Sequence, residues 1–219
     1  MYKRQHATPA AFYAHIDSRY KEKEIAQQLL NSSVDIALGG GQEFFNLEEA
    51  GKTHYLMTEK TSLEKNYDGI KNIVGLFDED GMERGPYMPT QREMTNYALD
   101  YLNDKCNGFF LMTEGSQIDW AGHSNDVEYM IREFKDFDLT IGDLINFVNE
   151  DNETLLIVTS DHGNADKMIN NDGSSHTAHT LNMVPIINFD KDVQFIKNGK
   201  LADIAPTLLN LMNIKKPII

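Results

Sequence analysis

Short apolar runs alternate with segments of helical periodicity along most of this 219-residue chain, and this alternation limits its possible folds more than any other feature. The apolar runs at Phe109–Thr113, Thr154–Thr159 and Val184–Asn188 are typical of buried strands. Two further runs, Val34–Leu38 and Ile73–Phe77, are also predicted strands. An alternation of this kind predicts an α/β fold with a largely parallel sheet flanked by helices.

Four segments are predicted helices. They are Glu22–Leu30, Gln91–Asn103, 127–148 and Leu201–Met212. The clearest is 127–148, where apolar residues recur every three to four positions, as on one buried helix face. These residues are Val127, Met130, Ile131, Phe134, Phe137, Ile141, Leu144, Ile145 and Val148.

The charge and the cysteine content exclude several classes of protein. A formal net charge of −14 argues against a nucleic-acid partner, because such proteins need basic surface to neutralise phosphates. The single cysteine excludes an internal disulfide framework and a cysteine-rich zinc module. No apolar run approaches the roughly 18 residues of a membrane span. A negative chain that acts on anionic substrates must concentrate positive charge locally, with metal ions or a few basic side chains.

Acidic and histidine side chains follow the predicted strand Phe109–Thr113. Glu114, Asp119 and His123 lie in GFFLMTEGSQIDWAGH. If Asp119 opens a helix, His123 lies one turn further along the same face. A carboxylate and an imidazole placed in this way can bind one zinc ion. The alternative is an acidic residue at a helix N-terminus beside a surface histidine.

Two more clusters lie beside predicted strands. Asp161 and His162 come directly after the strand Thr154–Thr159, and His176 and His179 precede the strand at Val184. Taken singly, Asp161 could cap a turn and the two histidines could be solvated. The first two clusters follow the carboxyl ends of their strands, where a parallel sheet places its sites. Three Asp/His clusters beside predicted strands are much less expected by chance than one, so together they favour a di-metal site.

The motifs EGSQIDWAGH, TSDHGN and HTLNMVPII resemble the metal-binding motifs of alkaline phosphatases, in their order along the chain. The resemblance implies two zinc sites and a neighbouring magnesium site. The implied ligands are Asp119, His123 and His179 for the first zinc, Asp161 and His162 for the second zinc, and Glu114 for the magnesium.

The segment HATPAAFYAHIDSR resembles the part of the same family that supplies a magnesium-binding threonine and a phosphate-binding arginine. The resemblance implies these roles for Thr8 and Arg19. The chemistry agrees, since Mg²⁺ prefers hard oxygen ligands and a guanidinium matches the geometry of phosphate oxygens. The alternative for Arg19 is a solvated charge, since the charged run YKEKE follows it.

The resemblance covers residues 6–219 and implies metal-dependent hydrolysis of small-molecule phosphate monoesters. It also implies a periplasmic or secreted location and a homodimer in the full-length protein. From the net charge and the apolar run lengths we expect neither a nucleic-acid nor a membrane partner. The segments DHGNADKM and LADIAPTLLNLM also resemble cofactor-independent phosphoglycerate mutase, so a mutase-like phosphotransferase is an alternative. Thr8, Arg19 and Glu114 favour the hydrolase. A non-catalytic metal-binding module is a further alternative.

Two motifs of the alkaline phosphatase pattern have no match in this chain. The family's nucleophilic serine, in an Asp-Ser-Ala context, and a bridging aspartate, in an Asp-Gly-Met-Gly context, both lie upstream of the segment matched at Thr8. Asp80-Gly81-Met82 imitates the second motif, but it lies at another position and Glu83 follows it, so we expect a turn there. Residues 1–5 resemble translated adapter sequence. We therefore expect a C-terminal portion of the enzyme, with a partial catalytic domain over residues 6–219 that is inactive alone.

Overall fold

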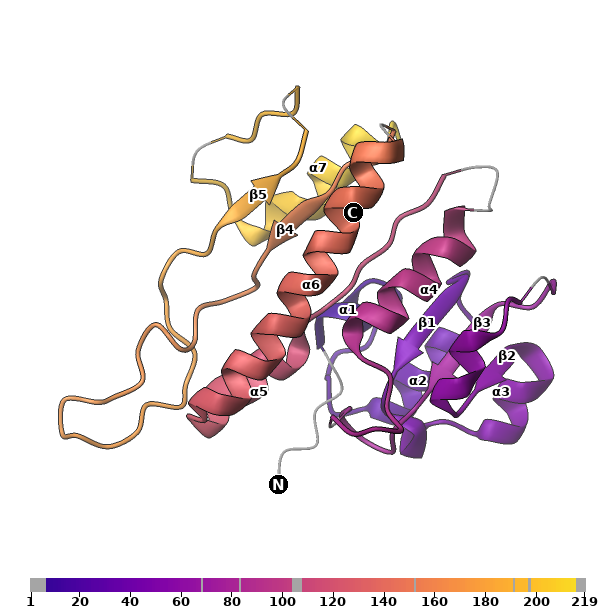
Figure 1. Cartoon of the computed structure of the whole chain (residues 1–219), viewed down its shortest axis with the longest axis horizontal. Coiled ribbons are helices and arrows are strands. Elements are labelled where there is room, and N and C mark those ends of the chain that lie inside the picture. The colour runs from indigo at the N-terminus through magenta and orange to yellow at the C-terminus, as the bar shows by residue number, and fades with distance from the viewer. Residues whose placement is uncertain are drawn as a thin grey trace. The chain divides into compact units, whose positions relative to one another are not determined.

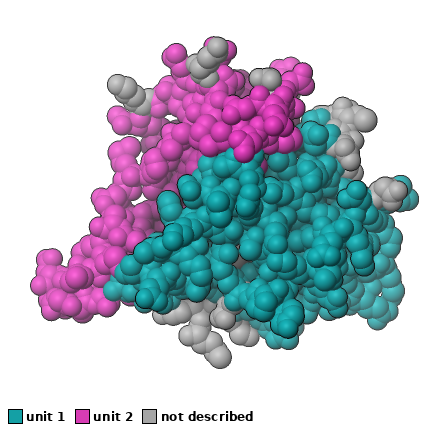
Figure 2. Space-filling model, viewed as in Figure 1, with its two compact units in different colours: residues 1–143 teal, residues 144–219 magenta. Residues whose placement is uncertain are grey.

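The computed structural model describes residues 7–67, 69–82, 84–103, 108–151, 153–190, 192–196 and 198–215. The chain divides into two compact units, residues 1–143 and residues 144–219 (Figure 2). The predicted adapter residues 1–5 and the single cysteine, Cys106, lie outside the described residues.

The first unit is built on a parallel sheet of three strands, β1 (Ile36–Gly39), β2 (Tyr55–Met57) and β3 (Ile73–Leu76), in the order β1-β3-β2 (Figure 1). All four residues of the central strand β3 are buried. A strand covered on both faces is expected to be apolar throughout, as β3 is. The predicted α/β class with a parallel sheet is confirmed.

Two apolar clusters lie on the sheet. One contains Leu30, Ala50, Val74 and Leu76, and the other contains Met57, Ile73 and Phe77. Successive residues of a strand point to opposite faces, so β3 contributes alternate side chains to the two clusters. Helices α2 (Glu22–Leu30) and α3 (Leu47–Thr53) supply the helical residues of the first cluster, and α4 (Gln91–Asn103) packs against the second.

The predicted helices α2 and α4 have the bounds expected from periodicity. Short elements without a strong periodic signal were not predicted, namely α1 (Ala7–Ala11), α3 and β2. In α3 a local signal exists, because the side chain of Asn46 accepts a hydrogen bond from the Glu49 N–H and so caps the helix. No helix among the described residues combines the length and the apolarity that a membrane span requires.

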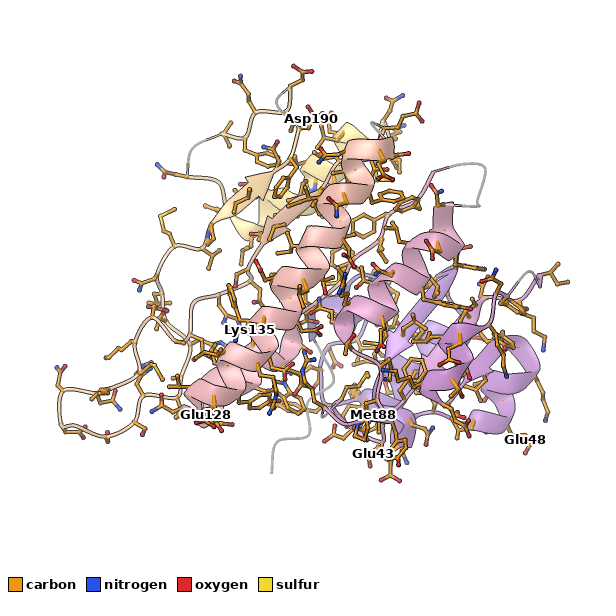
Figure 3. All side chains as sticks on the ribbon, in the orientation of Figure 1. Glu43, Glu48, Met88, Glu128, Lys135 and Asp190 are labelled. Atoms are coloured by element: carbon orange, nitrogen blue, oxygen red, sulfur yellow. The ribbon has the colours of Figure 1, made fainter. Side chains whose placement is uncertain are left out.

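The longest helix, α6 (Val127–Asp151), corrects the prediction of a buried apolar face. Its buried positions are Glu133, Asp136, Thr140 and Leu144, which follow helical spacing but are mostly polar. Several of the predicted core residues are about half exposed, among them Val127, Ile131 and Phe134. In Figure 3 the labelled Glu128 and Lys135 mark the first half of this helix.

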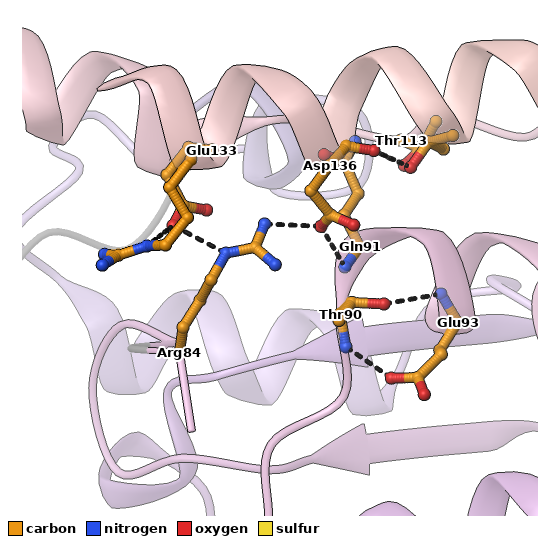
Figure 4. A network of polar contacts seen from close by, with 9 residues as sticks. Arg84, Thr90, Gln91, Glu93, Thr113, Glu133 and Asp136 are labelled. Carbon is orange, nitrogen blue, oxygen red and sulfur yellow. Dashed lines mark hydrogen bonds and ion pairs between the residues drawn. The ribbon is translucent and has the colours of Figure 1, made fainter. Parts of the chain in front are cut away.

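The polar stripe of α6 is satisfied by partners from the segment before α4 (Figure 4). The guanidinium of Arg84 pairs with Glu133 (Nε to Oε1, 2.7 Å) and with Asp136 (Nη2 to Oδ2, 2.6 Å). The backbone N–H of Gln91 donates to the same Asp136 oxygen at 3.0 Å. Burial opposes the charge on Arg84, but its hydrogen bonds to the two carboxylates outweigh that effect and raise its pKa. Buried carboxylates that are paired and hydrogen-bonded explain why this face need not be apolar.

The segment Phe109–Thr113 was predicted to be a buried strand, and this prediction is wrong. Its described residues form no strand, and Phe110 is half exposed. The ring of Phe110 stacks on Phe12, with centroids 5.4 Å apart. A strand requires a neighbouring strand to accept and donate its backbone hydrogen bonds, which apolar composition alone does not provide.

The second unit contains an antiparallel pair, β4 (Ile157–Thr159) and β5 (Ile186–Asn188), followed by a 3₁₀ turn (Leu201–Asp203) and helix α7 (Ile204–Leu211). Both strands are shorter than predicted, and they pair antiparallel instead of extending a parallel sheet. One long loop joins them, and antiparallel neighbours need no crossover helix. Ile186 and Ile187 of β5 are almost half exposed, so this strand is not the buried strand that we predicted.

Candidate metal centre

The first Asp/His pair lies on helix α5 (Ser116–Ser124) of the first unit. We expected Asp119 to open this helix, but the helix begins at Ser116. Asp119 therefore lies within its first turn. His123 follows one turn later, and its Nε2 lies 3.2 Å from an Asp119 carboxylate oxygen. Both side chains are partly exposed. The predicted placement of the two groups on one helix face is confirmed.

Glycines and an asparagine fix the position of α5. A Cβ on Gly115, the N-cap, would lie 3.0 Å from the ring of Phe137. Asn125 ends the helix in the left-handed conformation, with φ of 52°. A Cβ on Gly81 would lie within 2.2 Å of the Trp120 ring, so only glycine allows this helix to pack there. The segment Asp80-Gly81-Met82 lies in a bend, in agreement with its predicted role as a turn.

The predicted magnesium ligands also belong to the first unit. Glu114 lies in the segment that leads into α5, and one of its carboxylate oxygens is buried. Thr8 lies in the short helix α1 and is half-buried. Their shared binding of one ion stays a prediction.

Arg19, the predicted phosphate-binding residue, is exposed in a turn before α2. Its neighbours Asp17 and Lys21 form an ion pair at 2.7 Å. The structure therefore leaves the role of Arg19 as a prediction, with its guanidinium at the surface of the first unit.

The second cluster lies in the second unit, directly after β4. His162 Nε2 is 3.5 Å from a carboxylate oxygen of Asp161. The imidazole of His162 stacks on that of His179, with ring centroids 3.5 Å apart and planes inclined by 15°. Within this unit the structure brings together Asp161, His162 and His179. His176 lies on the adjoining hairpin, where its backbone N–H donates to Met168 at 2.8 Å.

A backbone contact that the sequence did not reveal joins the two segments that carry these stacked histidines. Gly163 and Thr180 form an antiparallel bridge, in which the Thr180 N–H donates to the Gly163 carbonyl at 2.8 Å. His162 and His179 each precede a residue of this bridge, so the bridge joins the two segments that carry the imidazoles. In an antiparallel register these two residues lie diagonally across the bridge and are not directly opposite. The two histidines are 17 positions apart in sequence, so no local spacing rule could have predicted their contact.

Two further histidines, His15 and His54, belong to none of these clusters. His15 is exposed, and its backbone N–H donates to Gln28 at 2.7 Å. His54 is buried and its Nδ1 lies 2.8 Å from the Thr53 hydroxyl. Burial, together with the charge of Lys71, lowers the pKa of His54. Neither observation indicates a metal ligand.

The described residues thus present two carboxylate–imidazole sets, one in each unit. Partly exposed carboxylates and imidazoles are the oxygen and nitrogen ligands that zinc binds in proteins. The predicted magnesium ligands, Glu114 and Thr8, offer the hard oxygen atoms that Mg²⁺ prefers. The chemistry of the donors fits a metal centre that binds and polarises an anionic substrate.

Comparison with known proteins gives a consistent result. A profile of the family described as "Alkaline phosphatase" matches residues 3–198. Alkaline phosphatase 4 of Bacillus subtilis is 35% identical to this chain over 228 residues, which cover 94% of this chain and 48% of that protein. The structure of alkaline phosphatase from the Antarctic bacterium TAB5 is similar with a TM-score of 0.71 at 30% identity, over 84% of this chain and 62% of that chain.

A second group of relatives has another activity. A 2,3-bisphosphoglycerate-independent phosphoglycerate mutase of Flavobacterium johnsoniae is 41% identical over 181 residues, which cover 78% of this chain and 36% of that protein. The chain spans about half the length of the Bacillus relative and about a third of the mutase.

Proposed function

We propose that this chain, which belongs to the alkaline phosphatase family, carries the metal-binding part of an enzyme that hydrolyses phosphate monoesters. One observation carries the proposal. Both Asp/His motifs of the family are present in order, and in each the carboxylate lies within 3.5 Å of its imidazole.

The proposed centre unites the two sets of donors. Asp119, His123 and His179 would hold a first zinc, Asp161 and His162 a second zinc, and Glu114 and Thr8 a magnesium. The stacked rings of His162 and His179 support this division, because imidazoles 3.5 Å apart can serve two neighbouring ions. When bound, a zinc pair lowers the pKa of an attacking hydroxyl and stabilises the leaving alkoxide.

The residues of this chain would then orient the substrate. The guanidinium of Arg19 would bind two non-bridging phosphoryl oxygens and hold the phosphorus in line for displacement. Because such contacts are made to the phosphoryl group, the site would accept many small alcohols as leaving groups. The resemblance to alkaline phosphatases also supports a periplasmic or secreted location and a homodimer.

A mutase-like phosphotransferase is the second candidate, and the match to the Flavobacterium mutase favours it. Glu114, Thr8 and Arg19 favour hydrolysis instead, because these residues follow the alkaline phosphatase pattern. Two assays distinguish these activities. A mutase interconverts 2- and 3-phosphoglycerate without releasing phosphate, whereas a phosphatase releases phosphate from p-nitrophenyl phosphate. A non-catalytic metal-binding module would do neither.

We expect the 219-residue chain alone to show no multiple-turnover hydrolysis of p-nitrophenyl phosphate, even with added zinc and magnesium. The chemistry needs a positioned hydroxyl, and no serine here has the Asp-Ser-Ala context. Ser160, beside Asp161, donates its hydroxyl to the His162 carbonyl at 2.8 Å and so shapes the loop. The measurement is phosphate release by the purified, folded chain. A longer protein that contains this chain and an Asp-Ser-Ala segment is the positive control, and robust turnover by the chain alone would disprove the assignment of a missing nucleophile.

In such an active, longer protein, replacing Arg19 with alanine is expected to weaken inorganic phosphate binding by about 1.5–3 kcal/mol, the cost of losing a charge-assisted hydrogen bond. Turnover should fall while the zinc content stays the same. Lys21→Ala is the matched control, since it removes a neighbouring cation that pairs with Asp17. Equal phosphate inhibition constants for Arg19→Ala and the parent enzyme would show that Arg19 is only a surface charge.

A further inference from the structure

The segment that carries His179 has two anchors to the loop after β4. The first is the backbone bridge between Gly163 and Thr180. The second is the side chain of Asp166, which lies in the same loop as His162. Its Oδ1 accepts a hydrogen bond from the Thr180 hydroxyl at 2.7 Å, and its Oδ2 accepts another from the side-chain amide of Asn182.

Both carboxylate oxygens of Asp166 therefore accept hydrogen bonds from residues that follow His179 in sequence. Thr180 is its immediate neighbour, so the carboxylate fixes the backbone next to the imidazole. The hydrogen bond from Thr180 lowers the pKa of Asp166, which keeps the group ionised as an acceptor of both bonds. The side chain is exposed, so its effect must come from geometry and not from desolvated charge.

Gly163 provides the room for this arrangement. A Cβ at this position would lie 2.4 Å from the Thr180 hydroxyl oxygen and 2.8 Å from Asp166 Oδ1. A larger residue at position 163 would therefore displace the side chains of Asp166 and Thr180. Gly163 thus allows the two loop segments that carry His162 and His179 to approach each other closely.

We propose that Asp166 is a positioning residue for His179, holding its imidazole against that of His162 through Thr180 and Asn182. The inference rests on the proposed function, in which His179 is a zinc ligand. Asp166 itself is not assigned as a ligand, because its two carboxylate oxygens already accept hydrogen bonds from the protein. Residues that orient a metal-binding histidine typically change metal affinity by about 10–100-fold when they are removed.

The test compares Asp166→Ala with Asp172→Ala in the full chain. Asp172 is a matched control, since it is an exposed acceptor in the same loop but bonds to Ser174, away from His179. Two quantities are measured: hydrogen exchange of the Thr180 amide by NMR without metal, and zinc affinity by competition with a chelator. Asp166→Ala should speed the exchange and weaken zinc binding at least about 10-fold, while Asp172→Ala should change neither.

Thr180→Val provides a second variant, because it removes the hydroxyl that Asp166 accepts from but retains the amide bonded to Gly163. It should weaken zinc binding in the same direction, and Gly163→Ala should do so too. If Asp166→Ala and Thr180→Val keep the zinc affinity and the Thr180 exchange rate of the parent chain, the positioning role is wrong. If the parent chain itself binds no zinc, the proposed function fails instead, so the two failures are distinguishable.

Discussion

Replacing His123 with alanine is expected to weaken zinc binding by at least about 100-fold, because a zinc site seldom retains its ion after losing one of three protein ligands. His123 forms its pair with Asp119 across one turn of α5, so the change removes the imidazole without altering a buried core residue. The measurement is competition with a chromogenic chelator. In an enzyme that contains this chain, turnover should fall with the zinc content.

The control for this variant is His15→Ala, which removes an exposed histidine that belongs to neither cluster. Its zinc affinity should equal that of the parent chain. A His123→Ala chain with the parent affinity would remove α5 from the metal centre and leave the second unit as the only source of ligands.

Replacing Arg84 with methionine is expected to lower the free energy of unfolding by about 3 kcal/mol, the lower end of the range for breaking a buried ion pair. The change leaves the Asp136 carboxylate without its cation and leaves Glu133 with only the more exposed Arg132. The side chains of both carboxylates are more than nine-tenths buried. Methionine keeps much of the side-chain volume, so the loss is chiefly electrostatic. Urea denaturation measures it.

Two comparisons separate this network from ordinary surface charge. Neutralising both carboxylates in the same chain, with Glu133→Gln and Asp136→Asn, should recover part of the loss, since no unpaired buried charge then remains. Arg92→Met breaks the exposed pair with Asp143 and should cost no more than about 1 kcal/mol. Equal destabilisation by Arg84→Met and Arg92→Met would contradict the buried role of Arg84.

The pattern of apolar residues predicted those helices and strands whose burial depends on their own residues. The apolar positions of α2 and α4 and the continuous apolar run of β3 indicate their environment without knowledge of a partner. The buried face of α6 could not be found in this way, because Glu133 and Asp136 are buried only where Arg84 and Gln91, more than 40 residues away in sequence, satisfy them.

The predictions of strand pairing were wrong for the same reason, because pairing also depends on partners that are distant in sequence. The run Phe109–Thr113 is as apolar as β3, yet its described residues have no strand beside them. The antiparallel register of β4 and β5 depends on how the loop between them folds, which no alternation of apolar residues specifies.

The candidate site also has one part that local spacing predicts and one part that depends on tertiary contacts. The Asp119–His123 pair follows from the geometry of one helix, so its spacing predicted it. The stack of His162 on His179 occurs between two segments of a loop that the bridge of Gly163 to Thr180 and the hydrogen bonds of Asp166 hold together, and these are tertiary contacts. The motifs identified the residues, and the loop determines their geometry.

Anomalous diffraction at the zinc absorption edge, on crystals of a zinc-loaded protein that contains this chain, tests the proposed centre most directly. The proposal predicts two zinc peaks about 4 Å apart. One should lie beside Asp119, His123 and His179, and the other beside Asp161 and His162. Zinc peaks confined to surface histidines, or separate peaks with the α5 pair and His179 on different, distant ions, would contradict it.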